Sequence, residues 1–372
     1  FLFRGSFSFS NDVCSFRMGN DFPQTITSGS YTFYTYLAQL DHYQENFRMQ
    51  RLLLVLSLIT MWNLPGPSVC VAADPLTVKS DFEGASVCVL KIDDVVRSVS
   101  FIPGGNPVRG WPCWWYFRVD GITPGETITL RLRCSTAMIE KRKPLPPSWA
   151  MPTQATFSID GETWLHSEKG QRQNEWMIYS LKVAAESVFV AWGPPYTPKT
   201  ANKFLFDMSQ LSPHAKIEEL CRSGENRPVP MLHVREGKLI DMQRFGVWVQ
   251  ARQHAWESGS SWVAQGFGEW LLSEDEEAAW LRQHGDIYII PVMDVDNTAT
   301  GNGGKNALPH DHNRDWSPKP HWKEVAAAQR MIRRLVNEGR MDVFLDLHTP
   351  SPSDDSFFYI LSKELLKKPM VG

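Results

Sequence analysis

The chain of 372 residues carries 38 Lys and Arg against 41 Asp and Glu, a formal net charge of −3. This near balance excludes the basic excess expected of a nucleic-acid-binding protein, and a hydrophobic content of 42% excludes a disordered chain. The length fits about two domains of ordinary size. Six cysteines without a CxxC pair allow at most one or two bridges.

The amino-terminal segment predicts an exported protein. Residues 1–48 show no sustained period and are interpreted as a non-native upstream extension ahead of a translation start at Met49. A basic start, an apolar run at 52–64 and small residues before Asp74 predict a signal peptide over 49–73. The run is shorter than the roughly 20 residues of a membrane span. A buried helix is the alternative.

Export has a consequence for the cysteines. A periplasmic or secreted protein meets an oxidising compartment, in which disulfides persist. Pairing is therefore open to Cys88, Cys113 and Cys134, and the sequence does not specify which two form a bond.

Residues 74–200 show the pattern of an amino-terminal β-sandwich. Turn signals such as Asp120-Gly121 and Asp160-Gly161 separate short runs of β-branched and aromatic residues. Several short strands at such spacing are typical of two packed sheets. The Pro-rich segment 141–152 is predicted to be a loop. The predicted strands are 86–92, 98–102, 114–122, 127–134 and 187–192.

A different pattern begins near residue 228. Continuous apolar runs alternate with segments of helical spacing, which predicts an α/β domain with a mixed, largely parallel sheet over 228–372. Residues 201–227 are interpreted as a connector with at most one short helix. The predicted strands are 245–252, 286–295 and 341–348, and the predicted helices are 257–273 and 321–339.

Three polar residues follow or end these strands. His254 and Glu257 come after the first strand, and His348 ends the last one. Open α/β sheets bind ligands at the carboxyl ends of their strands. Two histidines and a glutamate form the ligand set of a catalytic zinc, with a fourth position for water. A single strand-end histidine is more often an ordinary hydrogen-bonded residue, and the same set also suits non-haem iron.

Between these residues lies the segment Asp311-His312-Asn313-Arg314. An arginine beside an asparagine can hold a carboxylate through paired hydrogen bonds, and Asp311 can accept a hydrogen bond from a ligand imidazole. A charged surface loop is the alternative interpretation. The glycine-rich stretch 301–306 lacks the spacing of a phosphate-binding loop, and no G-x-S-x-G motif of a serine hydrolase is present.

In this order, HAWE, DHNRDW and LDLH resemble the zinc carboxypeptidases of the carboxypeptidase A superfamily. The chain is most similar to the branch of the cytosolic carboxypeptidases, which carry a β-sandwich before the catalytic domain. WWYFRVDGI and FVAWGPPYTP resemble the amino-terminal domain of that branch. The resemblance covers roughly residues 80–370.

The resemblance implies one Zn²⁺ per chain and a role for each motif residue. Asn313 and Arg314 fall on the residues that hold the terminal carboxylate of the substrate, and Asp311 falls on the partner of the first histidine ligand. The implied zinc ligands are His254, Glu257 and His348.

Two departures from the family pattern matter. The family has an arginine before the Asn-Arg pair that polarises the scissile carbonyl, whereas the cation found there in this chain is Lys305. Lys305 is either an oxyanion stabiliser or a solvated loop residue. The general-base glutamate of the family lies well beyond the third ligand, and this chain ends at Gly372, 24 residues after His348. We therefore expect a catalytic domain that is incomplete at its carboxyl end.

These features predict a zinc-dependent metallocarboxypeptidase that hydrolyses the carboxyl-terminal peptide or amide bond. Its expected substrates are peptide or protein C-termini, with no nucleic acid and no membrane span after signal cleavage. The alternative is a catalytically inactive relative that acts as a secreted binding module.

Overall fold

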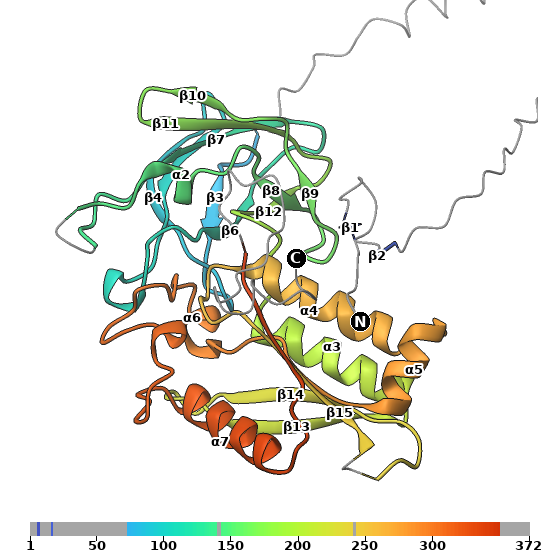
Figure 1. Cartoon of the computed structure of the whole chain (residues 1–372). Coiled ribbons are helices and arrows are strands. Elements are labelled where there is room, and N and C mark those ends of the chain that lie inside the picture. The colour runs from blue at the N-terminus through green and yellow to red at the C-terminus, as the bar shows by residue number, and fades with distance from the viewer. Residues whose placement is uncertain (1–5, 8–15, 18–72, 140–142, 241–242, 350–372) are drawn as a thin grey trace, which may run out of the picture. The chain divides into compact units, whose positions relative to one another are not determined.

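The computed structural model describes residues 6–7, 16–17, 73–139, 143–240 and 243–349 (Figure 1). Most of the upstream extension and nearly all of the predicted signal peptide lie outside these residues, as does the end of the chain after Thr349. Two short strands, β1 (Ser6–Phe7) and β2 (Phe16–Arg17), precede the main part. The other described residues belong to one compact unit.

Residues 77–191 form two five-stranded sheets. The short helices η1 (Pro107–Arg109) and α2 (Pro147–Ala150) lie in their connections. In spatial order, one sheet contains β3 (Thr77–Lys79), β6 (Tyr116–Asp120), β12 (Ser187–Ala191), β8 (Thr156–Ser158) and β9 (Leu165–His166). The other contains β10 (Gln171–Gln173), β11 (Trp176–Lys182), β7 (Thr127–Arg133), β5 (Ser98–Ile102) and β4 (Cys88–Asp93).

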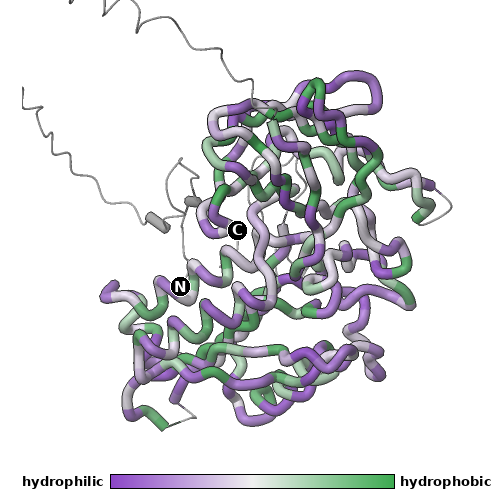
Figure 2. Tube along the Cα trace, turned by 180° about the vertical axis from the view of Figure 1, so that it is seen from behind, coloured by the Kyte–Doolittle hydropathy of each residue, from purple (hydrophilic) through white to green (hydrophobic). Residues whose placement is uncertain are grey.

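The two sheets share one hydrophobic core. Alternate residues of β7, from Ile128 to Leu132, are buried, as the period of a strand requires. The rings of Phe101 on β5 and Phe117 on β6 meet edge to face with centroids 4.8 Å apart. Figure 2 shows the apolar stretches along the strands and hydrophilic residues in many of the loops.

A third sheet has helices on both faces. Its strand order is β13-β14-β16-β15-β17. The β13–β14 and β14–β16 pairs are antiparallel, whereas β15 runs parallel to both β16 and β17. The strands are β13 (Ala215–Arg222), β14 (Pro228–Val234), β15 (Phe245–Ala251), β16 (Gly285–Ile290) and β17 (Val343–Leu347). The helices are α3 (Pro198–Leu211), α4 (Ser258–Leu271), α5 (Glu276–His284), α6 (Val295–Ala299), η4 (His312–Arg314) and α7 (Lys323–Asn337).

Alternate residues of β15 explain the position of these helices. Val247 and Val249 belong to the core cluster that includes α3 and α4, whereas Trp248 belongs to the cluster that includes α7. The strand is buried on both faces, as in other α/β folds. Two of the four strand pairs among the described residues are antiparallel and two are parallel. The sheet is mixed, as predicted, but it is not largely parallel.

Two expectations about this region are wrong. The connector predicted over 201–227 contains most of the 14-residue helix α3 and all of β13. Thr197, whose side chain accepts from the Thr200 amide, and a proline in the first turn were the available helix-start signals. The predicted strand 286–295 ends at Ile290, because Asp294 caps the short helix α6.

A glycine-rich segment joins the third sheet to the first two. The amide of Gly304 donates to the Arg109 carbonyl at 3.0 Å, and the Trp111 amide donates to the Lys305 carbonyl at 2.9 Å. A Cβ atom on Gly303 would lie 2.0 Å from the Trp111 carbonyl oxygen. The backbone of Gly303 therefore approaches Trp111 as closely as only glycine permits.

Gly303→Ala should lower the free energy of unfolding by roughly 1 to 3 kcal/mol, since the added methyl group has no space. The matched control is Gly266→Ala in α4, where a Cβ atom meets nothing within 4 Å. That control should be neutral or stabilising, because alanine favours a helix. Urea unfolding of both variants tests the close contact, and equal stabilities would contradict it.

Candidate metal centre

The turn after β15 carries two of the three predicted ligands. Arg252 follows the strand directly with a positive φ of 64°, and its side chain is buried. Its guanidinium donates to the carbonyl oxygens of Ala255 at 2.7 Å and Tyr196 at 2.6 Å. These bonds hold the turn closed. His254 and Glu257 therefore lie together between the end of β15 and the start of α4.

Trp256 lies between the two ligands in sequence and packs into the core of the first two sheets. Its side chain is 1% exposed. Its ring meets those of Trp192 and Trp149 edge to face, with centroid distances of 5.2 and 5.7 Å. Its amide donates to the Gly303 carbonyl at 3.0 Å. The ligand turn is thus held by the amino-terminal sheets as well as by β15.

The carboxylate of Glu257 lies between two imidazole rings. Its Oε1 is 2.8 Å from Nδ1 of His254, and its Oε2 is 2.7 Å from Nδ1 of His348 at the end of β17. One potential ligand atom from each of the three residues lies within 4.8 Å of the others. The structure therefore brings the three predicted ligands to one point, although 91 positions separate Glu257 from His348.

The Glu257 carboxylate and the two imidazoles stabilise the charged form of one another. Burial raises the pKa of Glu257, but hydrogen bonds with His254 and His348 outweigh burial and lower it to about 2. Burial lowers the pKa of His348, yet contacts with Asp346 and Glu257 raise it to about 10. His254 shows the same opposition, and its pKa is raised. The carboxylate is therefore ionised and attracts positive charge, which a divalent cation also supplies.

The donor set fits a zinc ion. Zinc binds neutral imidazole nitrogen and carboxylate oxygen, and catalytic sites use three such protein ligands. Both rings direct Nδ1 toward Glu257, which leaves Nε2 for other partners. Nε2 of His254 is buried without a close hydrogen bond, and Oδ2 of Asp311 lies 3.5 Å from it. A carboxylate on the far ring nitrogen is the usual support for a metal-binding histidine.

Asp311 connects this histidine to the loop that precedes η4. Its Oδ2 accepts from the Asn306 amide at 2.8 Å, and its Oδ1 accepts from the Arg314 amide at 3.0 Å. Burial raises the pKa of Asp311, but the nearby His254 imidazole and the hydrogen bond from the Asn306 amide lower it to about 2. An ionised Asp311 thus orients His254 and fixes the start of η4.

Asn313 lies beside the ligand set, and Arg314 follows it in η4. Nδ2 of Asn313 is 3.3 Å from Nε2 of His348, and Arg314 is exposed. Nζ of Lys305 lies 5.2 Å from the ring centroid of Trp111, a cation–π contact. The positive charge of Lys305 also lowers the pKa values of the nearby His254 and Asp311.

Two residues near His348, Asp346 and Gln253, were not predicted from the sequence. Oδ2 of Asp346 is 3.2 Å from Nε2 of His348 and accepts from Nε2 of Gln253 at 2.6 Å. The signal for Asp346 was available, because residues two apart on a strand share a face. Gln253 had no local signal, since only the parallel pairing of β15 with β17 brings it close.

Comparisons with known proteins agree with this site. Residues 201–351 match the zinc carboxypeptidase family. Cytosolic carboxypeptidase 2 of Danio rerio is 26% identical over 271 residues, which cover 66% of this chain and 37% of the relative. Cytosolic carboxypeptidase 3 of Bos taurus is 27% identical over 265 residues, which cover 66% and 26%. This chain carries a zinc carboxypeptidase domain and is homologous to the cytosolic carboxypeptidases.

Solved structures show the same fold. A metallo-carboxypeptidase from Burkholderia cenocepacia has a TM-score of 0.63 at 25% identity, covering 74% of this chain and 71% of that one. One from Pseudomonas aeruginosa, in complex with (2-guanidinoethylmercapto)succinic acid, has a TM-score of 0.61 at 24% identity, covering 74% and 70%. The prediction of a zinc carboxypeptidase-like fold is confirmed. The chain spans well under two thirds of the two curated relatives.

The prediction of an exported protein, periplasmic or secreted through a signal peptide, is wrong. The relatives are cytosolic carboxypeptidases by name, which points away from export. A short apolar run is an ambiguous signal, because buried helices have the same composition. The pairing that the sequence left open for Cys88, Cys113 and Cys134 is not formed, since all three are free thiols in the structure.

Among the described residues, no helix is both long and apolar enough to cross a bilayer.

Asp311→Asn should lower the zinc affinity about 10- to 100-fold, the usual effect of removing a carboxylate that supports a metal-binding histidine. Competition with a chromophoric chelator measures the affinity. The matched control is Asp160→Asn, because Asp160 also caps a turn, through the amides of Glu162 and Thr163. An Asp311→Asn variant with wild-type affinity would show that this carboxylate does not support His254.

Proposed function

We propose that this protein is a zinc-dependent metallocarboxypeptidase that removes residues from the C-termini of peptides or proteins. The observation that carries the proposal is the Glu257 carboxylate, which lies between the Nδ1 atoms of His254 and His348. Membership of the zinc carboxypeptidase family supports it. The alternative of a catalytically inactive, secreted binding module draws no support from the relatives, which are named carboxypeptidases.

His254, Glu257 and His348 would hold one Zn²⁺ per chain. When bound, zinc supplies a Lewis acid that polarises a carbonyl and lowers the pKa of water. Arg314 and Asn313 bind the terminal carboxylate of the substrate and so place the last peptide bond beside the metal ligands. In the chain, η4 lies between α6 and α7, and Nδ2 of its Asn313 is 3.3 Å from Nε2 of His348, which follows β17.

Two further roles belong to the reaction, the stabilisation of the oxyanion and the acceptance of a proton from water. Lys305 is proposed to stabilise the developing oxyanion, because its charge acts on both His254 and Asp311. Its contact with Trp111 favours a fixed position over free solvation. The acceptor of the proton from the attacking water is assigned to none of the described residues.

The domain arrangement follows from the cores. We propose that residues 74–200 form a β-sandwich domain, since their two sheets share one hydrophobic cluster. The carboxypeptidase domain follows from about residue 201, where the family match begins. The sandwich acts as a support for the catalytic site, because Trp256 belongs to the same cluster as the sandwich core.

Arg314→Ala should raise KM for peptides roughly 10- to 100-fold, because a hydrogen bond to a charged group contributes about 1.5 to 3 kcal/mol. Peptides with amidated C-termini should resist the wild-type enzyme for the same reason. Mass spectrometry of single-residue removal by the zinc-loaded protein gives both results. The matched control is Arg334→Ala, an arginine on α7 whose side chain is 61% exposed.

Equal cleavage of amidated and free peptides would contradict recognition of the terminal carboxylate. A zinc-loaded wild-type protein that cleaves no peptide would contradict the proposed activity itself.

A further inference from the structure

His312 is buried between two carboxylates outside the ligand set. It is 1% exposed, as are Asp294 and Glu324. Its Nδ1 lies 3.6 Å from Oδ2 of Asp294, and its Nε2 lies 3.6 Å from Oε2 of Glu324. The ring stacks on Trp322 with centroids 4.8 Å apart and planes 11° from parallel. We call His312 with these two carboxylates the His312 clamp.

The clamp favours a charged imidazole. At 3.6 Å the two contacts are attractions between charges, which an imidazolium makes with both carboxylates and a neutral ring makes with neither. Neither ring nitrogen has a closer hydrogen-bond partner among the described residues, nor does Oε2 of Glu324. Burial lowers the pKa of His312, but Asp294, Glu324 and Asp315 together raise it. Burial raises the pKa of Asp294, and the charge of His312 opposes that rise.

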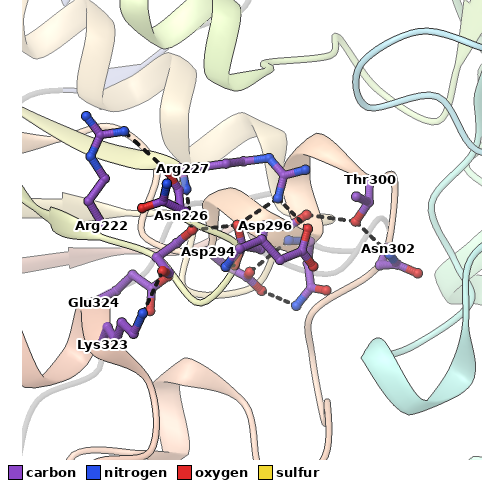
Figure 3. A network of polar contacts seen from close by, with 12 residues as sticks. Arg222, Asn226, Arg227, Asp294, Asp296, Thr300, Asn302, Lys323 and Glu324 are labelled. Atoms are coloured by element: carbon purple, nitrogen blue, oxygen red, sulfur yellow. Dashed lines mark hydrogen bonds and ion pairs between the residues drawn. The ribbon is translucent and has the colours of Figure 1, made fainter.

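Neighbouring cations are engaged with other groups. Arg227 donates to Asp296 at 2.8 Å, a contact drawn in Figure 3. Arg227 also pairs with Glu225. Nζ of Lys323 donates to the Ser223 carbonyl at 3.2 Å. Buried carboxylates need a paired charge. In the clamp, His312 supplies that charge for Glu324 and shares it with the buried Arg252 for Asp294.

The clamp joins η4 to the beginnings of two helices. Asp294 caps α6 by accepting from the Asn297 amide, and Glu324 lies in the first turn of α7. His312 is the first residue of η4, and the next two are Asn313 and Arg314. The backbone that carries these two side chains is therefore tied to two fixed points of the catalytic domain.

We propose that His312 is a positioning residue that fixes Asn313 and Arg314 for the carboxylate of a ligand. This inference rests on the proposed function, because it assigns the clamp to the same carboxylate-binding site. A loosened turn must be ordered when a ligand binds, which weakens binding. The clamp therefore sets the affinity for the carboxylate, whereas His254, Glu257 and His348 hold zinc independently of it.

The test measures the binding of (2-guanidinoethylmercapto)succinic acid, a dicarboxylate, to the full zinc-loaded chain by calorimetry. His312→Gln and Glu324→Gln should each weaken binding about tenfold, an effect in the range measured for coupled neighbours. The double variant, which removes both charges of this pair, should bind no more weakly than either single variant. Zinc content should be unchanged in all three, which an unfolded protein would not show.

A second measurement reports the charge directly. Nitrogen NMR at pH 8 should show both ring nitrogens of His312 protonated in the wild type, with the signal assigned by its loss in His312→Gln. The control is His284→Gln, because His284 stacks on Trp280 in the same way, with centroids 4.6 Å apart, but is only partly buried and faces no carboxylate pair among the described residues. That control should leave ligand binding unchanged.

The results for the positioning role of His312 and for the proposed peptidase activity can be told apart. A folded His312→Gln variant with wild-type affinity would overturn the proposal, as would a neutral His312 ring at pH 8 or a wild type that does not bind the probe. If only the double variant folds, its affinity for the probe is measured instead, and a wild-type value would overturn the proposal. A wild type that binds the probe but cleaves no peptide would remove the proposed function and leave the clamp standing.

Discussion

The buried carboxylate of Glu257 must be balanced by positive charge, and the structure around the site serves that requirement. A buried carboxylate without a partner costs several kcal/mol. Here it lies between His254, three residues before it on the same turn, and His348, which follows a parallel strand. Only the pairing of β15 with β17 brings these groups together. The sheet order of the catalytic domain is therefore the first condition for a metal site.

The second condition is a rigid ligand turn, and the amino-terminal sheets supply part of it. Trp256, one position before Glu257, is packed against Trp149 of α2 and Trp192, which follows β12. Gly303 accepts a hydrogen bond from Trp256 and lies against the backbone of Trp111. The glycine-rich stretch, which did not fit a phosphate-binding loop, thus serves close packing between backbones. The contacts of Trp149 and Trp192 with Trp256 show that several tryptophans of the chain pack around the ligand turn.

The sequence allowed the ligand set, the mixed sheet and most strands to be predicted, because strand ends and periodicity are local signals. It did not reveal α3 and β13, whose polar residues obscure their pattern. It also did not reveal the packing of Trp256 or the clamp around His312. Both depend on residues far away in the chain, such as Trp192 and Glu324, which no local pattern connects.

The most direct test of the site is anomalous X-ray diffraction at the zinc edge from crystals of the zinc-loaded protein. The geometry predicts one strong peak, from a zinc ion within bonding distance of Nδ1 of His254, Nδ1 of His348 and the Glu257 carboxylate. A peak bonded to other residues, or no peak at this point in a zinc-loaded crystal, would contradict the assignment of the metal centre.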